Sequence, residues 1–134
     1  MKVSELTAGP ILNNLTAIAQ EWVEHDYSQR WTPCSIWVNE KGIYPYPQGY
    51  QPSDNSPAQA FELIEKFKIY IDWLIGGDVR AQSLLKLGTN SAKGSTPAEA
   101  ICKAVICATL GDELDEGDPR WAHLLTSQEK DSAG

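Results

Sequence analysis

The chain has 134 residues, three of them cysteine, and a formal net charge of −7 at neutral pH. This length is typical of one domain that buries a single core without cross-links. The acidic balance argues against direct binding to nucleic-acid backbone or to anionic membrane. Apolar runs are too short to span a membrane and the sequence opens without a signal-peptide pattern, so we expect a cytosolic protein.

The cysteines do not follow a metal-binding spacing. Cys34, Cys102 and Cys107 are odd in number, and the last two lie five residues apart on a predicted helix. Residues five apart point in different directions on a helix, so we expect reduced thiols, no metal site and no cofactor.

In chain order, the first predicted helix spans residues 10–24, because Pro10 suits a helix start and apolar residues repeat at helical spacing. Residues 34–38 and 43–44 favour strand and predict a short hairpin, which Pro45 and Pro47 confine to an edge.

The second predicted helix begins at Ser56 and ends near Lys66, and the Ser-x-x-Gln spacing to Gln59 predicts a capping box. Alternating residues then predict strands over 68–75 and 79–87, joined by a tight glycine turn. Residues 88–94 are expected to form a polar loop.

The third predicted helix is the most strongly marked. Thr96 is a good N-cap, Pro97 suits the first helical position, and Glu99 completes a Thr-x-x-Glu capping box. Gly111 lies where a left-handed C-cap belongs, and the apolar spacing predicts one buried face.

The order helix, hairpin, helix, hairpin, helix predicts an α+β domain over residues 1–125. We expect a small antiparallel sheet of two hairpins with about three helices packed on it. Residues 126–134 are expected to form a disordered tail.

Three stretches carry a family resemblance: MKVSELT at the start, YQPSDNSPAQAFELIEKFKI in the middle, and GSTPAEAICKAVICATLGDEL near the end. Together they resemble the NinX-like family of small bacteriophage proteins, a domain of unknown function, over most of the chain. The segments 29–49 and 76–88 look longer than is usual in that family. The resemblance implies a phage accessory protein in the cytoplasm of an infected bacterial host, and it carries no catalytic residues over to this chain.

The segment 88–95 is a near miss to a phosphate-binding loop. Lys93 and Gly94 are transposed relative to the Gly-Lys-Ser/Thr ending, which argues against nucleotide hydrolysis. The N-terminus of the following helix still offers free N–H groups, with donors from Lys93, Ser95 and Thr96 around it. Either the helix binds phosphate there, or these residues only cap it.

The first predicted hairpin is rich in aromatic residues, which could stack on bases or form a satellite core under a proline-rich loop. With the helix terminus, they give a candidate ligand-binding set, which comprises Trp37, Tyr44, Tyr46, Tyr50, Arg80, Lys93, Ser95 and Thr96.

An acidic run follows the third helix. It does not have the spacing of an EF-hand, so it is either a solvated charge run or a surface that mimics nucleic acid to bind a protein. The alternative partner-binding residues are therefore Asp112, Glu113, Asp115, Glu116 and Asp118.

Three functional hypotheses follow. The first is a non-enzymatic counter-defence protein that binds and sequesters a small nucleotide-derived immune signal, as a homo-oligomer. The second is an inhibitor that binds a host defence complex through the acidic run. The third, an enzyme, is placed last because the sequence contains no catalytic motif.

Overall fold

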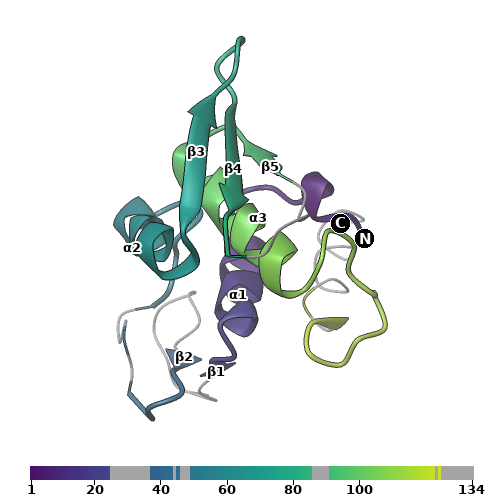
Figure 1. The fold of residues 1–134 in the computed structure, drawn as a ribbon. Helices are drawn as coiled ribbons and strands as arrows, with labels where there is room; N and C mark the ends of the chain where they lie inside the picture. The colour runs from purple at the N-terminus through teal and green to yellow at the C-terminus, as the bar shows by residue number, and fades with distance from the viewer. Residues whose placement is uncertain (25–36, 44, 46–48, 86–90, 123, 125–134) are drawn as a thin grey trace.

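The computed structural model describes residues 1–24, 37–43, 45, 49–85, 91–122 and 124 (Figure 1). Its elements, in chain order, are the 3-10 helix η1 (Val3–Glu5), α1 (Pro10–Ala19), β1 (Val23–Glu24), β2 (Trp37–Val38), α2 (Pro57–Phe67), β3 (Ile69–Trp73), β4 (Val79–Ser83), β5 (Ala92–Gly94) and α3 (Pro97–Thr109).

The predicted α+β class is confirmed. The strands β3, β4 and β5 form an antiparallel sheet in that order, and α3 packs against it, with α1 and α2 also contacting α3 (Figure 1). The strands β1 and β2 form a separate two-stranded ribbon. Within the described parts of the chain, no helix is long and apolar enough to cross a membrane.

The β3–β4 hairpin forms where the alternating pattern predicts it. Ile69 pairs with Ser83 and Trp73 with Val79, so inward and outward side chains stay in register along both strands. The turn between them uses Gly76 and Gly77, both at positive φ, which glycine adopts without steric cost.

The strand β5 corrects the prediction of a loop over residues 88–94. Ala92, Lys93 and Gly94 pair with Ala81, Arg80 and Val79 of β4, respectively. Three residues are too few for alternation to identify a strand, and the edge of β4 supplies the partner. The sheet was predicted to contain two hairpins. In the structure it contains the β3–β4 hairpin and β5, and the first predicted hairpin is not part of it.

The first helix is shorter than predicted and the first hairpin pairs differently. The helix α1 ends at Ala19, and Glu21 has a left-handed φ of 63°, which turns the chain into β1. β2 then pairs with β1. Near the predicted return strand, Asn39 N donates to the Ile43 carbonyl at 2.9 Å, and Ile43 N donates to Asn39 Oδ1 at 3.0 Å.

The helix α3 lies at the centre of the core. Every residue from Ala98 to Cys107 is buried, whereas the sequence predicts a single buried face. The difference arises because α1, α2 and the sheet all contact this helix, so that it has little exposed side. Gly111 has a φ of 101° and ends the helix as predicted.

The predicted capping box at the start of α2 is wrong. Ser56 makes no side-chain cap bond there. The Gln59 side chain instead accepts a hydrogen bond of 2.7 Å from Gln51 N and holds the preceding loop.

Candidate functional site

The N-terminus of α3 is closed by a side chain of its own. Thr96 Oγ1 accepts a hydrogen bond of 3.2 Å from Glu99 N, as the capping box predicts. The Glu99 carboxylate turns back and accepts a bond of 2.9 Å from Ser95 Oγ. The positive end of the helix is therefore already matched to a negative charge, which is the favourable arrangement for a helix N-terminus.

A lysine one turn along balances that carboxylate. Lys103 Nζ lies 3.3 Å from Glu99 Oε1, and the two side chains are only 5% and 8% exposed. Lys103 Nζ also donates to the Ser4 carbonyl at 3.5 Å, which links the helix to η1. Ser95 and Thr96 thus serve the helix cap, and the predicted phosphate site at this terminus is occupied by Glu99.

Arg80 and Lys93 lie elsewhere, on strands β4 and β5. They are paired across the two strands, so their side chains leave the same face of the sheet. Arg80 forms a salt bridge of 2.7 Å with Asp72 on β3. Since Ala81, Ala92 and the other buried positions alternate with them, this face is the one turned away from α3.

The aromatic candidates that the structure describes are part of a core. Trp37 and Tyr50 are buried in a second cluster with Ala17 and Trp22. The rings of Trp22 and Tyr50 have centroids 4.8 Å apart, and the Tyr50 hydroxyl accepts a bond of 2.9 Å from Gln20 Nε2. Tyr44 and Tyr46 lie outside the described residues. Trp37 and Tyr50 are thus too buried to stack on a ligand, and the satellite-core alternative describes them.

The acidic run is exposed but engaged locally. Asp115 accepts a hydrogen bond of 2.9 Å from Gly117 N, and Asp118 forms a salt bridge of 2.9 Å with Arg120. The hydrogen bonds from Arg120 lower the pKa of the Asp118 carboxyl. These contacts shape the turn after α3, so part of the charge that could mimic nucleic acid is already paired.

The segment 112–114, at the start of the acidic run, is hydrogen-bonded to the N-terminal residues of the chain. Val3 N donates to the Asp112 carbonyl at 2.9 Å, and Leu114 N donates to the Met1 carbonyl at 2.7 Å. Lys2 and Glu113 form an antiparallel bridge between these bonds. The N-terminal segment is therefore held against the exit of α3, and a hollow remains between it and β5.

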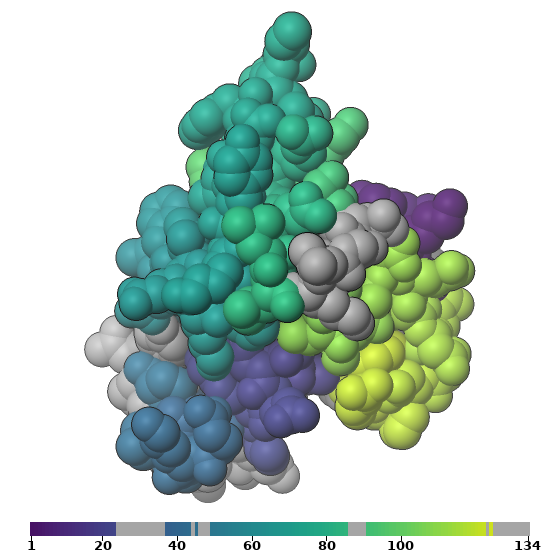
Figure 2. Space-filling view, in the orientation of Figure 1, coloured from purple at the N-terminus to yellow at the C-terminus, as the bar shows by residue number. Residues whose placement is uncertain are grey.

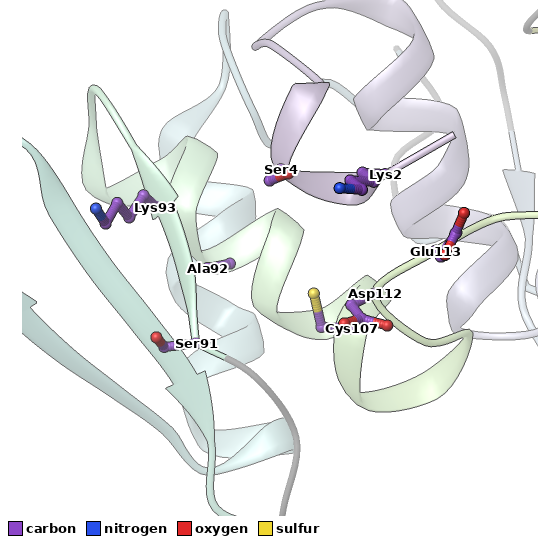
Figure 3. Close-up of a pocket in the computed structure, with 8 residues that line it drawn as sticks. All are labelled: Lys2, Ser4, Ser91, Ala92, Lys93, Cys107, Asp112 and Glu113. Atoms are coloured by element: carbon purple, nitrogen blue, oxygen red, sulfur yellow. The ribbon is translucent and has the colours of Figure 1, made fainter.

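That hollow is a pocket of about 480 Å³ (Figure 3). It is bounded by the N-terminal segment, by β5 and by the C-terminal end of α3, and its lining residues are Lys2, Ser4, Ser91, Ala92, Lys93, Cys107, Asp112 and Glu113. Figure 3 shows the Cys107 sulfur directed towards the space between β5 and η1, and the Lys93 amine directed away from it. Lys93 therefore lines the pocket with its backbone, and its ammonium group points away from the pocket.

The lining combines opposite charges with an apolar floor. Lys2 supplies a cation, Asp112 and Glu113 supply carboxylates, and Ala92 and Cys107 are buried beneath them. Burial, aided by the nearby Asp112 carboxylate, raises the pKa of the Cys107 thiol to about 11. The thiol is protonated at neutral pH, so it is a poor nucleophile and acts as part of the floor.

Sequence reasoning identified three of the eight lining residues, namely Lys93, Asp112 and Glu113, and assigned them to two different hypotheses. Lys2 and Ser4 were missed because they lie about 90 residues from β5 in sequence and carry no motif of their own. In the described part of the chain, no cluster of three or more His, Cys, Asp or Glu side chains is arranged to hold a metal ion.

Comparison of the chain with protein-family models finds no match, and comparison with curated proteins finds none either. The resemblance to NinX-like phage proteins therefore remains a prediction that rests on the three quoted stretches.

Proposed function

We propose that this chain is a non-enzymatic phage accessory protein that binds and sequesters a small nucleotide-derived immune signal. We place the binding site in the pocket between η1, β5 and the end of α3. The observation that carries the proposal is this pocket of about 480 Å³, whose lining includes the cationic Lys2 and the acidic residues Asp112 and Glu113. Small-molecule sites typically have volumes of about 300–1,000 Å³.

The mixed charge of the lining favours a ligand with both an anion and hydrogen-bond donors. A phosphate group would be bound by the Lys2 ammonium, whereas ribose hydroxyls or a base amine would donate to Asp112 and Glu113. A nucleotide carries both kinds of group. An acidic protein binds such an anion when a cation and backbone donors converge locally.

The pocket replaces the site predicted from sequence. Glu99 fills the N-terminus of α3, and Trp37 and Tyr50 are buried, so these groups support the fold of the binding protein. The phage setting and the counter-defence role rest on the family resemblance and remain part of the proposal.

Calorimetry of the purified chain with a panel of cyclic nucleotides and cyclic ADP-ribose isomers tests the proposal. We expect saturable heat with at least one member, and a weaker affinity for that member in Asp112→Asn, whose side chain cannot accept as an anion. Mass spectrometry of small molecules that stay with the protein through purification would identify a ligand outside the panel. Absence of heat together with absence of a retained nucleotide would overturn the proposal.

The second hypothesis, inhibition of a host defence complex through the acidic run, has weaker support because Asp115 and Asp118 are held in local contacts. It predicts that a host protein captured from lysate is lost when residues 112–118 are neutralised. The nucleotide proposal predicts that neutralising Asp115 and Asp118 leaves ligand binding intact, because neither residue lines the pocket.

A further inference from the structure

The strand β5 forms the edge of the sheet that faces the pocket. The β3–β4 hairpin projects from the molecular surface (Figure 2), and β5 pairs with β4 on the side nearer to η1 (Figure 1). Lys2 and Ser4 line one side of the pocket and residues 91–93 line the other. Among the described residues, η1 is bonded through its backbone to Asp112 after α3, and no backbone bond joins it to β5. The outer edge of β5 is therefore open to the pocket.

The hydrogen bonds of the β3–β4 hairpin determine which residues of β4 bond to β5. Leu84 N donates to the Lys68 carbonyl at 2.9 Å. Near the turn, Leu74 N donates to the Asp78 carbonyl at 2.8 Å. Hydrogen-bonded pairs alternate along an antiparallel ladder, so the even-numbered residues of β4 direct their backbone groups to β3. The odd-numbered residues of β4 consequently direct theirs to β5.

The same alternation assigns a direction to each backbone group of β5. Val79 is paired with Gly94 and Ala81 with Ala92, and these pairs hold the hydrogen bonds between the two strands. Lys93 lies between them, so its N–H and C=O groups point away from β4. Lys93 lines the pocket while its side chain is directed away from it (Figure 3). The N–H and C=O groups of Lys93 are thus directed to the pocket.

An outward N–H and C=O of one extended residue form a hydrogen-bond donor beside an acceptor. The edge of a nucleobase carries the complementary pair, as in the N7 acceptor and the N6 amino donor of adenine. A peptide strand would instead bond along an edge through every second residue, whereas Lys93 is the single residue of β5 directed outward. A single donor–acceptor pair at the wall of a pocket suits a base better than a strand.

We propose that the Lys93 backbone recognises the base of the bound nucleotide. The Lys93 N–H donates to a ring nitrogen of the base, and the Lys93 carbonyl accepts from the amino group beside that nitrogen. The ligand class is therefore a nucleotide whose base presents an acceptor next to a donor, as the adenine edge does. This inference rests on the proposed nucleotide site and adds the part of the ligand that lies against β5.

The rest of the lining suits the same ligand. A base that continues the sheet beyond β5 turns one face towards α3, which packs against the sheet. From α3, Cys107 directs its sulfur into the space between β5 and η1 (Figure 3). A sulfur atom next to an aromatic ring makes a favourable contact. Lys2, Asp112 and Glu113 then remain for the phosphate and the ribose.

Amide hydrogen exchange measured at single residues tests the proposal on the parent chain. In the free protein we expect fast exchange at Lys93 and slow exchange at Ala92 and Gly94, whose N–H groups bond to β4. Saturating AMP should slow exchange at Lys93 about tenfold or more, whereas ribose 5-phosphate, which lacks the base, should not. Slow exchange at Lys93 in the free protein, or no slowing with bound AMP, would overturn the proposal.

The substitution Lys93→Pro gives a second readout, because it removes the N–H from the pocket and no hydrogen bond from the sheet. Proline is tolerated in an edge strand where the N–H points outward. Lys93→Ala is the matched variant, since it loses the same side chain and keeps the N–H. Calorimetry should show AMP affinity about tenfold weaker in Lys93→Pro than in Lys93→Ala, and equal affinity for ribose 5-phosphate. Equal AMP affinity in the two variants would contradict the base contact.

The two probes separate failure of this inference from failure of the proposed function. Equal affinity of the parent chain for AMP and ribose 5-phosphate, without slowing at Lys93, would remove the base contact and leave the anion site at Lys2 in place. Binding of neither probe would also overturn the base contact, and the cyclic-nucleotide panel decides the proposed function separately.

Discussion

Replacing Glu99 with glutamine should destabilise the fold strongly, because it breaks a buried ion pair without changing the size of the side chain. In the parent chain the Glu99 carboxylate lies 3.3 Å from Lys103 Nζ, with both side chains less than a tenth exposed. The variant leaves the Lys103 ammonium buried beside the Ser4 carbonyl at 3.5 Å. Loss of one partner of a buried pair costs about 3–5 kcal/mol.

That cost is a large part of the total, since domains unfold with free energies of about 5–15 kcal/mol. Urea unfolding at neutral pH, followed by tryptophan fluorescence, measures this loss of stability. The variant should unfold at a lower midpoint urea concentration, with an unchanged dependence of the free energy on urea concentration. The double variant Glu99→Gln with Lys103→Met should recover most of the loss, because it removes the unpaired charge. Arg80→Gln is the control: the Arg80 pair with Asp72 is closer, at 2.7 Å, but both side chains are exposed, so its loss should cost below about 1 kcal/mol.

A loss below about 1 kcal/mol for Glu99→Gln would refute the reasoning, since such a value is typical of exposed pairs. So would a double variant as unstable as the single one. Either result would mean that the Glu99–Lys103 pair is not a buried ion pair that stabilises the fold.

Two further substitutions test the packing and the pocket floor. Gly94→Ala would place the new Cβ 2.6 Å from Ala100 N, so we expect the free energy of unfolding to fall by about 1–3 kcal/mol. Gly117→Ala is the control, because the atom nearest to its new Cβ is 3.5 Å away, and it should change the stability little. Equal effects of the two substitutions would contradict the close approach of β5 to α3. Burial raises the pKa of Cys107 from 9.0 to about 11, so the stabilisation from keeping this thiol neutral is complete below pH 9.0 and is lost as the pH rises towards 11. Urea unfolding across that range should show a smaller loss in Cys107→Ala than in the parent chain, and an identical loss would contradict the burial of the thiol.

Local patterns predicted the elements whose cause is local. The capping residues Thr96 and Gly111 mark both ends of α3, and strict alternation identifies the strands β3 and β4. In each case the neighbours in sequence supply the physical reason, so the sequence contains the signal.

Elements that depend on distant partners were missed. The strand β5 forms because β4 offers an edge, and α3 is buried on all sides because α1, α2 and the sheet surround it. The pocket joins Lys2 to Asp112 through backbone bonds between segments more than a hundred residues apart. No periodicity or spacing encodes such a meeting, so the candidate site had to come from the structure.

The central claim is that the pocket between η1, β5 and α3 binds a nucleotide-like anion through Lys2. The most direct measurement is a calorimetric comparison of Lys2→Gln with Lys93→Gln, using the panel member that binds the parent chain most tightly. The two variants remove the same charge from the pocket lining, but the Lys93 amine points away from the pocket (Figure 3). We expect affinity about tenfold weaker for Lys2→Gln and unchanged for Lys93→Gln. Equal loss in both variants, or no loss in Lys2→Gln, would contradict the account.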